Sequence, residues 1–167
     1  MGFRTDQIHA GVEPDPITGA ILTPIYQSTT FVQESVDDYM AKGFSYTRAG
    51  NPTVAAFERR MAALEKGVAS TAYGSGMAAT VSVMMALLSA GDHAVVSDVV
   101  YGGTHRFAPQ VLGRFGVAFS FVDTSDLAAV EAAIRPNTKL VFIETPANPT
   151  LKLTDLAAVC EITKAGG

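Results

Sequence analysis

From residue 51 onward, short apolar segments alternate with segments of helical periodicity, and this alternation strongly limits the possible folds. The apolar segments, which we predict to be strands, are residues 68–73, 94–97, 117–122 and 140–143. The predicted helices are residues 51–67, 76–88, 104–115, 126–134 and a last one capped by Thr154. Strands that are apolar throughout and separated by helices are typical of a parallel sheet with helices on both faces. The sequence therefore predicts an α/β fold with a mostly parallel sheet.

The first 50 residues lack this regularity and are rich in polar residues and turn formers. A segment of that length without a pattern of its own seldom folds alone. It nevertheless carries apolar side chains that need burial, among them Ile21, Ile25 and Phe31. We therefore expect residues 1–50 to form an arm that contacts a neighbouring subunit, and residues 51–167 to form the α/β domain.

Composition excludes several classes of function. The chain has 167 residues, a formal net charge of -4 and one cysteine. One cysteine rules out a disulfide framework and a cysteine-based zinc site, and the three histidines show no metal-ligand spacing. The mild acidity argues against nucleic-acid binding, and no apolar run approaches the ~20 residues of a membrane span. Residues 1–8 show no signal-peptide pattern, so we expect a cytoplasmic protein without a metal, nucleic-acid or membrane partner.

Glycines and polar residues follow three of the predicted strands at their carboxyl ends, where open α/β sheets bind ligands. Residues 74–79 (GSGMAA) would let N–H groups at a helix N-terminus approach an anion, and a phosphate is the natural guest. Tyr101 precedes two glycines, so its ring can stack on a flat heterocycle. Asn148 lies between Pro146 and Pro149, and its amide can donate to a phenolic oxygen.

Each of these motifs also has a simpler interpretation. Glycines also make tight turns, Tyr101 can be an ordinary half-buried tyrosine, and an Asn-Pro pair is a common turn. Residues 74–79 also fit the dinucleotide pattern G-x-G-x-x-G/A, with Asp98 about 20 residues on as a ribose-binding acid. An NAD-binding Rossmann module is therefore an alternative, although it gives Tyr101 and Asn148 no role. A non-catalytic short paralogue that binds a full-length partner through its arm is a further alternative.

Four motifs together resemble one known family. They are residues 46–53 (YTRAGNPT), 74–79 (GSGMAA), 98–104 (DVVYGGT) and 143–150 (IETPANPT). The resemblance is to the Cys/Met-metabolism enzymes that use pyridoxal 5'-phosphate (PLP), and it runs along nearly the whole chain. This family includes cystathionine γ-synthase, cystathionine γ-lyase, methionine γ-lyase and the homoserine-ester sulfhydrylases. It implies the large domain of the PLP-dependent transferase fold of type I (aspartate-aminotransferase-like), here incomplete.

The resemblance also implies which residues contact the PLP phosphate. Gly76 and Met77 would present backbone N–H groups to it, with Ser75 lining the site. Tyr46 and Arg48, whose phenol and guanidinium can both donate to phosphate, would reach the phosphate of a neighbouring subunit. On the residues alone, this segment can equally be a loop with a solvated arginine. The family resemblance implies a homodimer or homotetramer.

Around the cofactor ring, the resemblance implies three further roles. Tyr101 would stack on the pyridine ring and assist proton transfer, Asn148 would contact the ring's 3-hydroxyl oxygen, and Glu144 would line the pocket. The implied reaction is trans-sulfuration at the γ (or β) carbon of sulfur amino acids or homoserine esters, with PLP as electron sink. Residues 101–104 (YGGT) favour cystathionine γ-synthase or γ-lyase, because methionine γ-lyases usually carry a cysteine at the position of Gly103. O-acyl-homoserine sulfhydrylase and methionine γ-lyase are the alternatives.

The family's Schiff-base lysine and the aspartate that faces the pyridine nitrogen have no matching sequence context here. The lysines of the chain, none of which fits that context, are Lys42, Lys66, Lys139, Lys152 and Lys164. We therefore interpret the sequence as an N-terminal fragment of such an enzyme that is inactive by itself.

Overall fold

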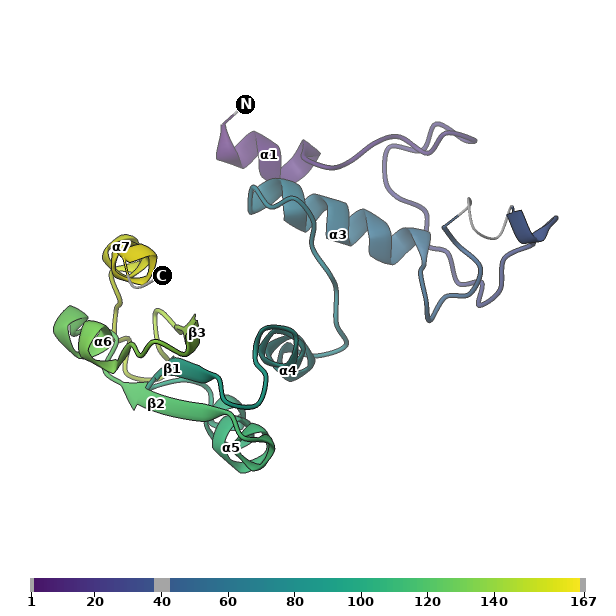
Figure 1. Ribbon diagram of the computed structural model, residues 1–167. Coiled ribbons are helices and arrows are strands. Elements are labelled where there is room, and N and C mark those ends of the chain that lie inside the picture. Colours follow the sequence, from purple (N-terminus) through teal and green to yellow (C-terminus); the bar gives the residue numbers. More distant parts are fainter. Residues whose placement is uncertain (1, 38–42, 166–167) are drawn as a thin grey trace. The chain divides into compact units, whose positions relative to one another are not determined.

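The computed structural model describes residues 2–37 and 43–165, so Lys42 lies outside the described residues. The chain forms two compact units, Met1–Ala72 and Tyr73–Gly167. Figure 1 labels their helices and strands. The first unit contains helices α1 (Phe3–His9) and α3 (Pro52–Leu64). The elements of the second unit are α4 (Gly76–Leu87), β1 (His93–Ser97), α5 (Gly102–Gln110), the 3₁₀ helix η1 (Leu112–Phe115), β2 (Ala118–Val122), α6 (Leu127–Ala133), β3 (Thr138–Phe142) and α7 (Leu156–Ala165).

In the first unit, α3 begins where the sequence predicts it. The Asn51 side chain caps the helix by accepting from the Thr53 N–H over 2.8 Å, and Pro52 takes the first helical position. The Asn51 amide also donates to the Tyr26 carbonyl over 2.9 Å, and the Tyr26 N–H donates to the Thr53 hydroxyl over 2.9 Å. The start of α3 therefore holds part of the irregular N-terminal segment. At its other end α3 stops at Leu64, before Gly67, with Lys66 in the left-handed conformation (φ 56°).

The strand predicted at residues 68–73 does not form. The Ser70 hydroxyl instead donates to the Glu58 carbonyl over 2.7 Å, and the Ala72 N–H donates to the Glu58 carboxylate over 2.8 Å. Backbone and side-chain groups of this segment are thus bonded to α3 and not to a neighbouring strand. The alternation of strands and helices therefore yields three strands in the described part of the chain, not four.

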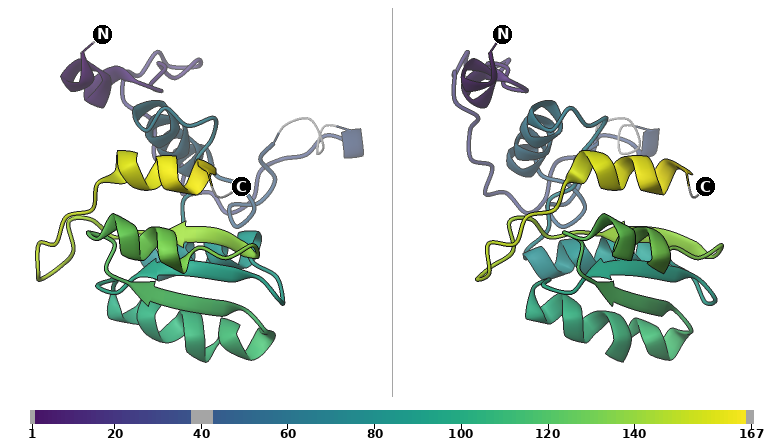
Figure 2. Two further views of the ribbon diagram at one scale, coloured as in Figure 1. Left: turned by 60° about the vertical axis from the view of Figure 1, so that its left-hand side comes forward. Right: turned by 90° about the vertical axis from the view of Figure 1, so that its left-hand side faces the viewer.

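The second unit is built on a parallel sheet with the strand order β2-β1-β3. The central strand, β1, is buried along its whole length, which explains its apolar sequence. Figure 2 shows α5 on one side of the sheet and α7 on the other. The first face carries a core of buried residues from α4, β1, α5 and η1, which includes Met84, Val96 and Ala108. The predicted α/β architecture with a parallel sheet covered on both faces is confirmed.

Several predicted helix boundaries differ from the structure, as the end of α3 at Leu64 already shows. The helix predicted at residues 104–115 ends at Gln110 and continues as the short η1, closed by Gly116 in the left-handed conformation (φ 85°). The predicted cap of α7, Thr154, is replaced by Asp155, whose carboxylate accepts from the Ala158 N–H over 3.0 Å. Thr154 bonds instead to Thr124, with 2.7 Å between the two hydroxyl oxygens.

Candidate functional site

The second unit contains a pocket of about 440 Å³ at the end of the sheet where β1 and β3 terminate. Its lining residues come from α4, the β1–α5 connection, α5 and the end of β3; they are Ser75, Gly76, Met77, Thr80, Tyr101, Thr104, Phe142 and Glu144. All five residues that the sequence predicts around the cofactor between positions 75 and 144 line this pocket. Open α/β sheets bind ligands at this edge of the sheet.

The N-terminus of α4 forms one wall of the pocket. Ser75 caps this helix, and its Oγ accepts from the Ala78 N–H over 3.1 Å. The N–H groups of Gly76 and Met77, the first two residues of the helix, have no acceptor inside it. Together with the helix dipole they favour an anion in the pocket.

The surroundings of Gly76 leave space for that anion. A side chain built at Gly76 would meet no atom within 4 Å, so the backbone there faces open space. A phosphate can therefore approach the N–H groups of Gly76 and Met77 closely. The pocket volume is within the usual range for small-molecule and cofactor sites. The residues present thus fit the phosphate end of PLP.

Tyr101 also lines the pocket. This residue precedes α5 and is 63% exposed. Its N–H donates to Glu144 Oε2 over 2.8 Å, which fixes the start of α5 against the segment that follows β3. A Cβ added at Gly103 would lie 2.5 Å from the Tyr101 ring and 2.8 Å from the Met77 sulfur. Because Gly103 has no side chain, the ring and the thioether can both lie close to its backbone.

Three pocket residues were not predicted from the sequence: Thr80, Thr104 and Phe142. Thr80 lies one helical turn after Gly76, and Thr104 lies three residues after Tyr101. Phe142 precedes Glu144 by two positions and therefore shares its side of the chain. Helix and strand periodicity, applied outward from the predicted residues, would have found all three.

Asn148 is exposed in the connection between β3 and α7 and does not line the pocket. The connection is closed on itself, since the Ala147 N–H donates to the Lys152 carbonyl over 3.0 Å and the Leu151 N–H donates to the Ala147 carbonyl over 2.7 Å. Asn148 therefore sits in an ordered loop next to the buried Ala147. Its contact with the cofactor remains a prediction.

Tyr46 and Arg48 belong to the first unit. The guanidinium carbon of Arg48 lies 4.9 Å from the centre of the Tyr46 ring, a cation–π arrangement. Arg48 also lines a pocket of about 330 Å³ together with Asn51 and Glu58. The two predicted phosphate donors are thus close together, while their contact with a neighbouring subunit stays a prediction.

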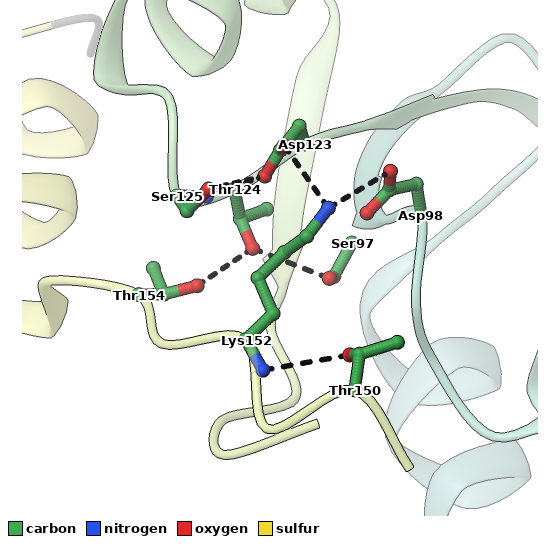
Figure 3. Close-up of polar contacts among 8 residues, drawn as sticks. All are labelled: Ser97, Asp98, Asp123, Thr124, Ser125, Thr150, Lys152 and Thr154. Carbon is green, nitrogen blue, oxygen red and sulfur yellow. Dashed lines mark hydrogen bonds and ion pairs between the residues drawn. The ribbon is translucent and has the colours of Figure 1, made fainter. Parts of the chain in front are cut away.

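A polar cluster that the sequence did not predict joins three loops at the carboxyl ends of the strands (Figure 3). The Lys152 ammonium lies 3.0 Å from Asp123 Oδ2 and 3.5 Å from Asp98 Oδ2. A hydrogen bond from the Ser125 hydroxyl, followed by the one from Lys152, lowers the pKa of Asp123 to about 2. The hydrogen bond to Asp123 in turn raises the pKa of Lys152. The aspartate and the lysine are therefore charged at neutral pH.

Residues 2–37 and 43–165 contain neither a cluster of metal-binding side chains nor a membrane-spanning helix. No group of three or more His, Cys, Asp or Glu side chains in these ranges is arranged to hold a metal ion. None of the helices described there is both long and apolar enough to cross a membrane. Among the lysines of the same ranges, none lines the pocket.

Comparison with known proteins gives one consistent result. The sequence profile of the family described as "Cys/Met metabolism PLP-dependent enzyme" matches residues 4–167. The chain is 43% identical over 166 residues to the probable cystathionine gamma-synthase of Herpetosiphon aurantiacus. This alignment covers 99% of this chain and 51% of that protein. It is 48% identical over 167 residues to the cystathionine gamma-lyase of Bacillus subtilis. This second alignment covers 100% of this chain and 43% of that protein.

A solved structure agrees with these relatives. Cystathionine gamma-lyase from Lactobacillus plantarum, complexed with L-serine, superposes with a TM-score of 0.91 at 48% identity, over 99% of this chain and 42% of that one. The chain thus spans about half the length, or less, of the proteins it matches.

These findings decide between the cofactors considered from the sequence. An NAD site would need Asp98 to bind a ribose, whereas the structure pairs its carboxylate with Lys152. The match of residues 4–167 to a PLP-dependent family identifies PLP as the cofactor. The open space at Gly76 and the Tyr101 side chain in the pocket lining fit it. The chain belongs to the Cys/Met-metabolism family of PLP-dependent enzymes.

Proposed function

We propose that the protein carrying this chain is a trans-sulfuration enzyme that acts at the γ (or β) carbon of sulfur amino acids or homoserine esters. The observation that carries the proposal is the pocket, which combines the N-terminus of α4 with the Tyr101 ring and the Glu144 carboxylate. The names of the relatives, cystathionine gamma-synthase and gamma-lyase, support these two reactions first. We also propose that the enzyme acts in the cytoplasm, as expected for amino-acid metabolism.

Four of the pocket residues have a proposed part in holding the cofactor. The N–H groups of Gly76 and Met77 bind the phosphate at the start of α4, and Ser75 keeps that helix end in shape through its cap. The Tyr101 ring stacks on the flat pyridine and excludes water from one of its faces. Bound PLP supplies an electron sink for a carbanion at the substrate α carbon.

Tyr101 and Glu144 are proposed to serve the proton steps. The phenolic O–H of Tyr101 is a donor and acceptor that lies at the pocket, so it can hold or move a proton near the substrate. Glu144 keeps that residue in place by accepting its N–H over 2.8 Å. Asn148 is proposed to donate to the 3-hydroxyl oxygen of the cofactor.

The proposal extends to a homo-oligomer, a dimer or tetramer, in which the arm completes a neighbour's site. Tyr46 and Arg48 would supply the extra phosphate donors. The lysine that holds PLP and the acid that faces the pyridine nitrogen are expected outside residues 1–167.

Gly103 favours the synthase and lyase branch over methionine γ-lyase. A side chain at this position, such as the cysteine usual in methionine γ-lyases, would come within 2.8 Å of the Met77 sulfur and closer still to the Tyr101 ring. The pocket described here therefore has the shape expected of an enzyme with glycine at this position.

The test uses the protein as its source produces it, freed of cofactor and titrated with PLP and with pyridoxal, which lacks the phosphate. We expect PLP to bind at least tenfold more tightly, since charge-assisted hydrogen bonds contribute about 1.5–3 kcal/mol each. The loaded protein is then given cystathionine, or a homoserine ester with cysteine. Formation of a keto acid and ammonia from the first, or of cystathionine from the second, supports the proposal. Absence of PLP uptake, or uptake without either reaction, contradicts it.

A further inference from the structure

Lys152 joins three loops that leave the carboxyl ends of the sheet (Figure 3). It lies in the β3–α7 connection, while Asp98 directly follows β1 and Asp123 directly follows β2. Its ammonium contacts both carboxylates, at 3.5 Å and 3.0 Å. The Lys152 side chain is 28% exposed, and those of Asp98 and Asp123 are 39% and 43% exposed. A single cation therefore fixes the spacing of these loops.

The backbone of Lys152 is equally tied to the loop that carries Asn148. Its carbonyl accepts from the Ala147 N–H over 3.0 Å, and the Ala147 carbonyl accepts from the Leu151 N–H over 2.7 Å. Asn148 lies inside this closed loop. A shift of Lys152 would consequently shift Asn148 as well.

At the other end of the bridge, Asp98 lies three residues before Tyr101. The segment with Tyr101 is also bonded to Glu144, at the beginning of the β3–α7 connection. Two polar links, Asp98–Lys152 and Tyr101–Glu144, thus hold the same pair of loops together. One loop presents Tyr101, and the other presents Asn148.

We propose that Lys152 is a positioning residue, which sets the distance between the loop of Tyr101 and the loop of Asn148 by bridging Asp98 to its own loop. The inference rests on the proposed function, in which these two side chains contact the cofactor ring. Lys152 itself lies outside the pocket lining and is not a catalytic residue. Loss of its charge would leave two carboxylates facing each other and let the loops separate.

The test compares four single variants with the unmodified protein as its source produces it. K152M removes the charge, K152R keeps it, D98N weakens the link to the Tyr101 loop, and D123N weakens only the link to the loop after β2. K164M is the matched control, because Lys164 and its partner Glu161 are both exposed side chains of α7. The readouts are the PLP dissociation constant, the circular dichroism band of bound PLP, and the unfolding midpoint of the PLP-free protein.

We expect K152M to weaken PLP binding about fivefold and to alter the circular dichroism band, as loss of an ion pair of this kind allows. K152R and K164M should keep the values of the unmodified protein. D98N should alter the band more than D123N, because only Asp98 leads directly to Tyr101. This ordering separates positioning from a general loss of stability, which would lower the unfolding midpoint alike in both aspartate variants.

Three results would overturn the inference. One is PLP binding and a cofactor band in K152M equal to those of K164M. Another is a lower unfolding midpoint in K152M without any change in the cofactor band. The third applies if K152M does not fold: the test then rests on D98N, and an unchanged cofactor band in D98N overturns the inference. A protein that takes up no PLP at all overturns the proposed function and this inference together, whereas normal uptake with unchanged variants overturns the inference only.

Discussion

The backbone N–H of Tyr101 donates to Glu144 Oε2 over 2.8 Å, across 43 positions of sequence. This bond joins the connection after β1 to the connection after β3. A carboxylate acceptor makes it stronger than a bond between neutral groups. The backbone of Tyr101, which carries the pocket's aromatic ring, is therefore held by a glutamate that need not touch the cofactor itself.

Removal of this acceptor should loosen Tyr101. We expect Glu144→Ala to lower the free energy of unfolding by about 1 kcal/mol and to weaken PLP binding, while Glu144→Gln, which keeps an oxygen acceptor, has a smaller effect on both. Urea unfolding and PLP titration measure the two quantities. Glu161→Ala is the control, because Glu161 is an exposed residue paired only with Lys164 among its described salt bridges. Equal losses in the alanine variants of Glu144 and Glu161 would refute this prediction.

Gly103 should tolerate no side chain without a change at the pocket. The added methyl group of Gly103→Ala would collide with the Tyr101 ring and the Met77 sulfur, and both are movable side-chain atoms. We expect them to swing aside, so that PLP affinity falls by up to about tenfold while the unfolding midpoint hardly changes. Gly102→Ala is the matched control, since its methyl group would meet only Arg106 at 3.9 Å. Unchanged PLP affinity in Gly103→Ala would show that the ring position is unimportant.

His93 should make the stability of the protein depend on pH. It is fully buried in β1, with Nδ1 2.8 Å from the Thr138 hydroxyl and Nε2 3.0 Å from the Ser120 hydroxyl. Burial, and then the charge of Arg135, lower the pKa of His93 below its usual 6.5. The unfolded chain therefore binds the proton at a higher pH than the folded chain does.

The stability that neutral His93 supports is present above pH 6.5 and is lost as the pH falls toward the lower pKa of the folded state. Urea unfolding at pH 8 and pH 5 should show this loss. In His93→Gln the loss between these two pH values should shrink, whereas in His9→Gln, at an exposed position, it should persist. An undiminished pH dependence in His93→Gln would contradict the assignment.

The carboxyl group of Asp123 should titrate near pH 2 in an NMR titration, instead of at 3.8. Because the Ser125 hydroxyl is the largest cause and Lys152 acts through both a hydrogen bond and its charge, Ser125→Ala and Lys152→Met should each raise the pKa of Asp123. Thr150→Ala should leave it unchanged, since Thr150 contacts the backbone of Lys152 and not Asp123. The stability linked to this group is complete above pH 3.8 and is lost as the pH falls toward 2. An unchanged pKa of Asp123 in either the serine or the lysine variant would disprove these causes.

Local signals in the sequence were sufficient for most helix starts, although the cap of α7 is Asp155 and not the predicted Thr154. Asn51 and Asp126, the first residues of two predicted helices, cap those helices, because a cap needs only the next two or three residues. Residues 68–73 were predicted wrongly, because a strand needs a partner that local sequence does not specify. In this chain Glu58 takes the N–H of Ala72 instead.

The residues of the site also fall into those that local sequence predicts and those that it does not. Gly76, Tyr101 and Glu144 were predicted because glycine-rich and polar segments after strands are recognisable one at a time, and the family motifs contain them. The sequence distinguishes Lys152 only as one of the lysines that lack a Schiff-base context. Its bridge to Asp98 spans 54 positions, and no periodicity or motif reports a contact of that range.

The residues that line the pocket and the residues that fill the buried core are different sets in the described chain, apart from Phe142, which also packs against the core. A substitution at most pocket positions therefore leaves the packing of β1 and its covering helices almost intact. Substitutions in these connections can thus change the pocket with little effect on folding. This separation explains how enzymes named for synthesis and for cleavage of cystathionine can share one scaffold at 43% and 48% identity with this chain.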